Sequence, residues 1–206
     1  MKCDVHVHSD TVDRDAVRKF VAECERTETR VCVMSFGPWT DHAGVDNDQT
    51  LAVAKEYPAV MVPFAYVDLW DRVDAGCVER FREAGFRGLK CITPYYAYDH
   101  DLYMPVYERA ERLGLPIVFH TGAFRPGPTD RTSRRPAVRN MEPLAIDRIA
   151  RSFPNLRIVL AHLGTTLFRR DAAEMIKLHP NVYGDLAGGG SWMAVTPEEL
   201  TGLLEH

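Results

Sequence analysis

Short apolar runs alternate with longer amphipathic stretches along most of the chain. The apolar runs are rich in β-branched residues, as buried strands are, and they cover residues 3–8, 30–35, 60–67, 86–92, 115–120, 157–162 and 181–186. Helical periodicity covers 12–27, 48–56, 73–84, 101–113, 142–153 and 168–178, and a shorter helix is expected after Thr196 and Pro197. This alternation is typical of a parallel sheet covered by helices. A doubly wound sheet and a closed barrel both fit it.

The composition predicts a single domain and argues against nucleic-acid and membrane partners. With 206 residues, 46% hydrophobic and 26% charged, the chain is expected to form one soluble domain over residues 1–206. A net charge of −4 argues against nucleic-acid binding, and no apolar stretch is long enough to predict a membrane span or a secretion signal. The five cysteines are an odd number without any C-x-x-C, which predicts neither a disulfide framework nor a thiolate zinc site. We therefore expect a cytoplasmic protein.

Polar side chains gather where the predicted strands end. The first strand carries both His6 and His8, which share one face because side chains two residues apart in a strand point the same way. The later strands end on Lys90, His120, His162 and Asp185. The carboxyl ends of the strands of an α/β barrel meet around one mouth, and imidazole and carboxylate groups are ligands for zinc, iron or manganese. The pattern thus predicts a metal site there.

Each of these residues also has a purely structural interpretation. His120 and His162 could be satisfied core histidines, and Lys90 could be a buried lysine paired with a carboxylate. The occurrence of such residues at one strand end after another favours a shared site. His42, His100 and His179 lie in predicted loops or at a helix end and are assigned to the surface.

Five segments in this order, DVHVH, RGLKC, PIVFHTG, IVLAHLG and NVYGDLAG, resemble the amidohydrolase superfamily. The similarity is greatest to its amidohydrolase-related branch of metal-dependent TIM-barrel hydrolases, lactonases and non-oxidative decarboxylases, and it extends along almost the whole chain. It implies a (β/α) TIM-barrel fold with His6, His8 and His120 as metal ligands. It also implies that His162 polarises the substrate carbonyl or binds a second metal. Lys90 would be carbamylated in a binuclear site and unmodified in a mononuclear one. One divalent ion, most naturally zinc, is expected.

The sequence departs from the family pattern at one point. Family members carry an aspartate at the end of an eighth strand, where it binds the metal and accepts the proton of the attacking water. The strand spacing places that strand beyond residue 206, so we expect a barrel that lacks its eighth strand and a chain incomplete at its C-terminus. Residues 204–206 match the start of a vector-encoded tag as well as the end of a helix. Asp185 is the candidate substitute, and the open barrel edges are expected to favour a homo-oligomer.

The reaction expected from these residues is metal-dependent hydrolysis of a C–O or C–N bond in a small lactone, ester or amide. His162, Asp185 and Lys90 would be catalytic. Arg125, Arg134 and Arg135, in the long arginine-rich loop 121–141, are candidates to clamp a substrate carboxylate, although a charge run also fits a solvated face. Two alternatives stay open: a non-oxidative decarboxylase of an aromatic or unsaturated acid, and a truncated or non-catalytic barrel remnant. Truncation would leave the chain weakly active until an eighth strand is added.

Overall fold

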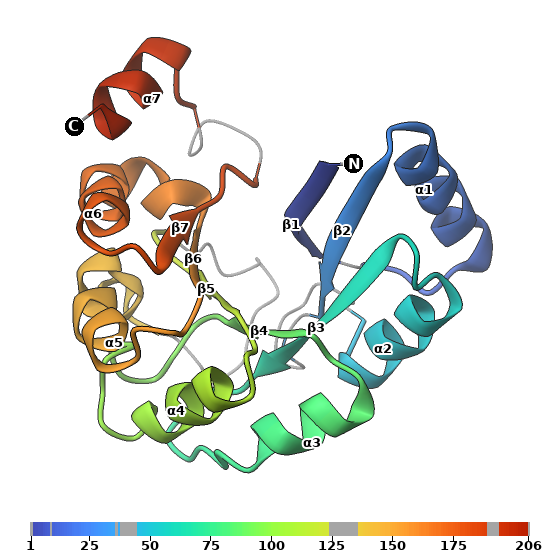
Figure 1. Ribbon diagram of the computed structural model, residues 1–206, viewed down its shortest axis with the longest axis horizontal. Coiled ribbons are helices and arrows are strands. Elements are labelled where there is room, and N and C mark those ends of the chain that lie inside the picture. The colour runs from blue at the N-terminus through green and yellow to red at the C-terminus, as the bar shows by residue number, and fades with distance from the viewer. Residues whose placement is uncertain are drawn as a thin grey trace.

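Seven parallel strands form one sheet in the order β1-β2-β3-β4-β5-β6-β7. The computed structural model describes residues 2–8, 10–35, 37, 45–123, 136–188 and 194–205. Figure 1 shows the strands curling into an arc with the helices on its outer side. The arc stays open between β1 and β7, and no eighth strand is found among the described residues. The architecture is a TIM-barrel-like α/β fold without its eighth strand, as predicted.

All seven predicted strands are present. They are β1 (Lys2–His8), β2 (Thr29–Met34), β3 (Met61–Val67), β4 (Gly88–Cys91), β5 (Ile117–His120), β6 (Ile158–Ala161) and β7 (Val182–Gly184). Each pairs in parallel with its sequence neighbours, so the carboxyl ends of all seven strands lie at one edge.

The predicted helices are also present, with shifted ends. They are α1 (Arg14–Arg26), α2 (Asn47–Glu56), α3 (Cys77–Ala84), α4 (Met104–Arg112), α5 (Ile146–Ser152), α6 (Thr165–Leu178) and α7 (Pro197–Leu204). The helix predicted over 142–153 is shorter because two 3-10 turns, Val138–Met141 and Pro143–Ala145, precede α5. Pro143 begins the second turn and has no amide proton to donate, which separates the two turns from each other.

Apolar side chains are buried on both faces of the sheet. The outer face packs against the helices in two clusters that include Val33 on β2 and Leu89 on β4. The inner face holds a smaller cluster with Met34, Phe64 and Val118. Gly88 makes room there, because a Cβ at this position would lie 2.3 Å from the Phe64 ring. Burial on both faces explains why the strands are continuously apolar in sequence.

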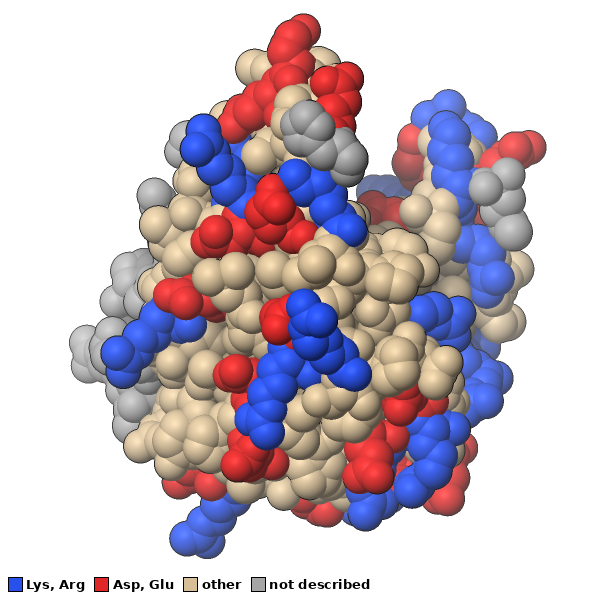
Figure 2. All heavy atoms as spheres, turned by 60° about the vertical axis from the view of Figure 1, so that its left-hand side comes forward, with Lys and Arg blue, Asp and Glu red and all other residues tan. Residues whose placement is uncertain are grey.

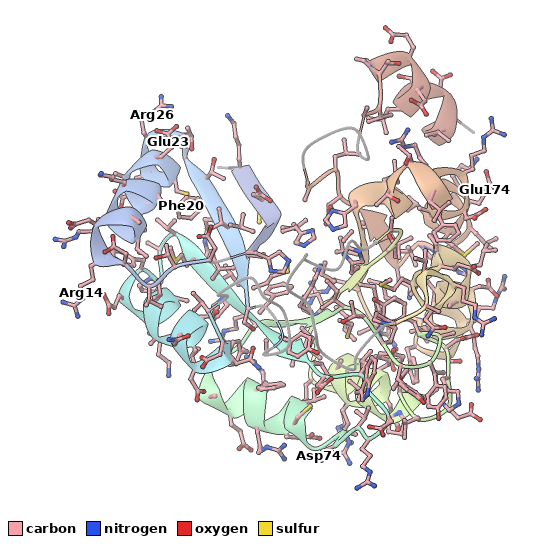
Figure 3. All side chains as sticks on the ribbon, turned by 180° about the vertical axis from the view of Figure 1, so that it is seen from behind. Arg14, Phe20, Glu23, Arg26, Asp74 and Glu174 are labelled. Carbon is pink, nitrogen blue, oxygen red and sulfur yellow. The ribbon has the colours of Figure 1, made fainter. Side chains whose placement is uncertain are left out.

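Charged side chains lie on the outside of the helix layer. Figure 3 shows Arg14 and Arg26 of α1 and Glu174 of α6 pointing away from the sheet. Within the described part of the chain, no helix combines the length and the apolar character needed to cross a bilayer.

Candidate metal centre

Six polar residues from five strands meet at the carboxyl edge of the sheet. His8 and His120 are the last residues of β1 and β5, and Lys90 is the next-to-last residue of β4. His162 and Asp185 lie one residue beyond the ends of β6 and β7, slightly later than the sequence suggested. Together with His6 on β1, these are the six residues that the sequence selected, and the structure brings them together.

His6 is held between the two open edges of the arc. Its Nδ1 lies 3.0 Å from Oδ2 of Asp185, which links β1 directly to the end of β7. The other carboxylate oxygen, Oδ1, accepts hydrogen bonds from the backbone N–H of His162 at 2.9 Å and of Ala187 at 3.0 Å. A carboxylate only accepts, so the His6 proton lies on Nδ1, and Nε2 presents its lone pair to the mouth.

A bulge in β1 turns the two histidines of the H-x-H motif toward one point. The register between β1 and β2 shifts between Asp4 and Val7, which is the segment that contains His6. The Nε2 atoms of His6 and His8 lie 3.2 Å apart. The sequence predicted the shared face, and the structure adds the close approach of the two rings.

Lys90 is fully buried next to His6. Its Nζ lies 2.8 Å from His6 Nε2, so the amine donates to the lone pair of the imidazole. Burial lowers the pKa of Lys90 to about 8, and the negative charge of Asp185 opposes this shift. For Asp185, burial alone would raise the pKa, but the hydrogen bond and charge of His6 and the His162 amide lower it to about 2.

His120 and His162 face each other with ring nitrogens. His162 Nδ1 lies 2.6 Å from the carbonyl oxygen of Ala187, and His120 Nε2 lies 3.4 Å from that of Ala123. Carbonyl oxygens only accept, so these nitrogens carry the ring protons. The other two nitrogens, His162 Nε2 and His120 Nδ1, are 3.2 Å apart. They can share the His120 proton in an N–H···N hydrogen bond when it lies on Nδ1, or they can bind one metal ion.

The lowered pKa values keep the imidazoles of the centre neutral. Burial, followed by the charge of Lys90, lowers the pKa of His162 to about 4. Burial likewise holds the pKa of His8 and of His120 well below the usual histidine value, and it lowers that of His6. Neutral imidazoles are the form that binds metals.

The distances between the nitrogens also fit a metal ion. Two ligands at 2.0–2.1 Å from a tetrahedral zinc ion are about 3.3 Å apart, and the two imidazole pairs show 3.2 Å. One set of described residues, His6, His162 and Asp185, has ligand atoms that all lie within 4.8 Å of one another. This trio differs from the predicted trio His6, His8 and His120, and the two sets share His6. The ligand assignment of the predicted trio stays a prediction.

The other sequence candidates are placed as follows. Arg125, Arg134 and Arg135 lie outside the described residues, so their assignment as a carboxylate clamp remains a prediction. His42 also lies outside them. His100 is on the surface as predicted, but His179 is buried with its Nε2 2.9 Å from Asp147 Oδ1, so its surface assignment was wrong. The end of α6 turns His179 inward toward α5.

Sequence reasoning missed a buried tyrosine beside the centre. The hydroxyl group of Tyr98 donates to the carbonyl oxygen of His120 at 2.8 Å and of Cys91 at 3.3 Å. Tyr107 in turn donates to the Tyr98 carbonyl oxygen at 2.9 Å. Tyr98 thus ties the ends of β4 and β5 together. A tyrosine in a loop gave no sequence signal for this role.

Comparisons with solved structures identify the same fold in known enzymes. A probable 2-pyrone-4,6-dicarboxylic acid hydrolase from Acinetobacter baumannii matches with a TM-score of 0.63 and 11% identity, over 98% of this chain and 75% of that one. The 5-carboxyvanillate decarboxylase from Sphingomonas paucimobilis matches with a TM-score of 0.52 and 17% identity, over 79% and 68%. The dihydroorotase from Campylobacter jejuni matches with a TM-score of 0.55 and 19% identity, over 89% and 52%. At these identities the similarity shows the fold alone.

The family follows from a match to the sequence itself. No curated protein matches the chain significantly. The family model described as amidohydrolase, however, matches residues 3–204, which is nearly the whole chain and includes all six residues of the centre. The chain therefore belongs to the amidohydrolase family.

Proposed function

We propose that the chain is a metal-dependent hydrolase that cleaves a C–O or C–N bond in a small, carboxylate-bearing lactone, ester or amide. The observation that carries the proposal is the convergence of four imidazoles at one edge of the sheet, with ring nitrogens 3.2 Å apart in the pairs His120–His162 and His6–His8. Neutral imidazoles whose ring nitrogens lie this close can share one proton in an N–H···N hydrogen bond or bind one cation together. A divalent ion is the cation that such a set selects, and zinc suits its nitrogen ligands.

One ion is proposed, held by His6, His8 and His120; His6 also has a ligand atom within 4.8 Å of those of His162 and Asp185. When bound, the ion acts as a Lewis acid and lowers the pKa of a water ligand toward neutrality. Lys90 is proposed to stay an unmodified amine that would give up its hydrogen bond to His6 Nε2 when that nitrogen binds the ion.

The remaining residues orient groups and move a proton. His162 is proposed to polarise the substrate carbonyl, a role that needs a proton on its Nε2 because Nδ1 already donates to the Ala187 carbonyl oxygen; its ring stands 4.8 Å from the rings of both His6 and His120. Asp185 is proposed to accept the proton of the attacking water. Its carboxylate already accepts hydrogen bonds from His6, His162 and Ala187, which orients the imidazole of His6 and leaves little capacity for a further proton. We therefore expect slow hydrolysis.

A carboxylate-bearing substrate is proposed because of the arginines in the loop after β5. Arg125, Arg134 and Arg135 would clamp the carboxylate in a bidentate fork.

Figure 2 shows basic and acidic side chains interspersed over the face that it presents, without a basic patch there that would suit nucleic acid. The five cysteines are all free thiols, which fits our proposal of a cytoplasmic protein.

Non-oxidative decarboxylation is the second candidate. It is favoured by the three hydrogen bonds of Asp185, because loss of carbon dioxide from an aromatic or unsaturated acid needs no acceptor for a water proton. Decarboxylation requires instead that a substrate carbon be protonated. Lys90, with a pKa of about 8, is a donor at neutral pH.

A substrate panel on metal-loaded protein tests these proposals. The panel contains lactones, amides and aromatic acids, and the matched control is His100→Ala, which alters an exposed histidine away from the centre. Hydrolysis of lactones or amides that is lost in His162→Asn and kept in His100→Ala supports the hydrolase. Release of carbon dioxide supports the decarboxylase. Absence of any turnover together with absence of bound metal would contradict both and favour the non-catalytic remnant.

A further inference from the structure

The two loops that follow His120 and His162 are joined by one buried hydroxyl group. Thr121 is the residue after His120, and its Oγ1 donates to the carbonyl oxygen of Ala161 at 2.6 Å. Thr121 Oγ1 also accepts a hydrogen bond from the backbone N–H of Gly164 at 3.2 Å. Thr121 is fully buried. Its side chain therefore holds Ala161, which precedes His162, and Gly164, which lies two positions after it.

A second threonine makes the reciprocal connection. Oγ1 of Thr165, three residues after His162, accepts from the backbone N–H of Ala123 at 3.2 Å. Gly122 lies between the two connections with φ of +96°, and a Cβ there would come within 2.4 Å of Gly164 O and Thr165 Oγ1. The HTG and HLG segments of the sequence thus form one interlocked unit that a side chain on Gly122 would push apart.

The backbone that this unit holds is strained. Four consecutive residues have positive φ: His162 at 62°, Leu163 at 42°, Gly164 at 70° and Thr165 at 56°. For residues other than glycine this region is sparsely populated, and a β-branched residue such as Thr165 is a genuine outlier there. Such conformations persist only where the surroundings fix them, and they cluster at functional sites. Thr121 supplies two of the hydrogen bonds that hold the backbone around His162 in this conformation.

We propose that Thr121 is a positioning residue that sets the separation between the imidazoles of His120 and His162. Its hydroxyl group connects the backbone of one histidine to that of the other, while the two ring nitrogens stand 3.2 Å apart at the mouth. The expected effect of Thr121 on metal affinity rests on the function proposed above. Its expected effect on the geometry of the two rings is independent of that function.

The test compares Thr121→Val, which keeps the shape and removes the hydroxyl group, with Thr121→Ser, which keeps the hydroxyl group. Thr50→Val is the matched control: Thr50 is equally buried, on α2, and its hydroxyl group has no hydrogen-bond partner among the described residues. Zinc affinity is measured by competition with a chromogenic chelator. Imidazole nitrogen shifts of metal-free protein labelled with 15N-histidine are recorded in parallel.

We expect Thr121→Val to bind zinc about 10- to 100-fold more weakly, as is usual when groups that orient metal ligands are lost. Thr121→Ser and Thr50→Val should bind within about threefold of the wild type by the same measure. The histidine shifts should change in Thr121→Val alone. Unchanged shifts in Thr121→Val, or equal changes in all three variants, would overturn the positioning role. If the wild-type protein binds no zinc, the proposed function fails, while the shifts of the metal-free protein still decide the role of Thr121. Should Thr121→Val not fold, Thr121→Ala and Thr121→Ser are compared in the same way.

Discussion

Replacing Asp185 by asparagine should destabilise the metal-free protein, because this carboxylate joins the two open edges of the sheet. It accepts from His6 Nδ1 on β1 and from the backbone N–H groups of His162 and Ala187 near β6 and β7. Burial would raise its pKa, but these partners lower it to about 2. Against an unfolded value of about 3.9, that difference corresponds to about 2–3 kcal/mol of folding free energy at pH 7.

The sign of the pH dependence follows from the lowered pKa of Asp185. Its stabilisation is fully present above the unfolded value of about 4 and is lost as the pH falls through the folded value of about 2. Asparagine does not ionise, so the difference in free energy of unfolding between the wild type and Asp185→Asn should be largest near neutral pH. It should narrow below about pH 4.

Urea denaturation in the presence of a chelator measures this difference. The matched control is Asp147→Asn, since Asp147 also pairs with a histidine, His179, at 2.9 Å, but its side chain is 39% exposed whereas that of Asp185 is 7% exposed. The control should lose less than about 1 kcal/mol. Equal losses in the two variants, or no loss in Asp185→Asn, would refute the conclusion that the buried pair fastens β1 to β7.

Three further outcomes are expected. Tyr98→Phe should lower the free energy of unfolding by about 1–3 kcal/mol in urea denaturation, since two buried carbonyl groups lose their donor; an unchanged midpoint would contradict this. Zinc at 100 times its dissociation constant should stabilise the protein by about 2.7 kcal/mol, or roughly 5–10 °C in calorimetry, and no shift would count against a zinc site. The free edges of β1 and β7 should make the protein self-associate with rising concentration in analytical ultracentrifugation, whereas a monomer at all concentrations would show that the edges are protected.

The strands and the gathering of the centre could be predicted from sequence because both depend on a simple geometric rule. Parallel strands place their carboxyl ends at one edge, so His8, Lys90, His120 and the neighbouring residues had to converge once the strands were recognised. The H-x-H spacing likewise predicted two imidazoles on one face.

The contacts inside the centre could not be predicted in the same way. The link from His6 to Asp185 joins residues 179 positions apart and depends on how far the arc closes. The left-handed turn after His162 contradicts local preferences and exists because Thr121 and Thr165 fix it from outside. The 3-10 turns before α5 follow a helical sequence pattern closely enough to be taken for its first turn.

Metal content under limiting zinc shows whether the imidazoles at the carboxyl edge of the sheet bind a metal ion. The protein is dialysed against zinc and analysed by inductively coupled plasma mass spectrometry, together with His6→Ala, His120→Ala and the control His100→Ala. The imidazoles of His6, His8 and His120, which we propose as the ligands, predict one ion per chain in the wild type and in His100→Ala, and a large loss in the other two variants. A wild-type protein that retains no zinc, manganese or iron, or variants that retain as much as the wild type, would contradict the account.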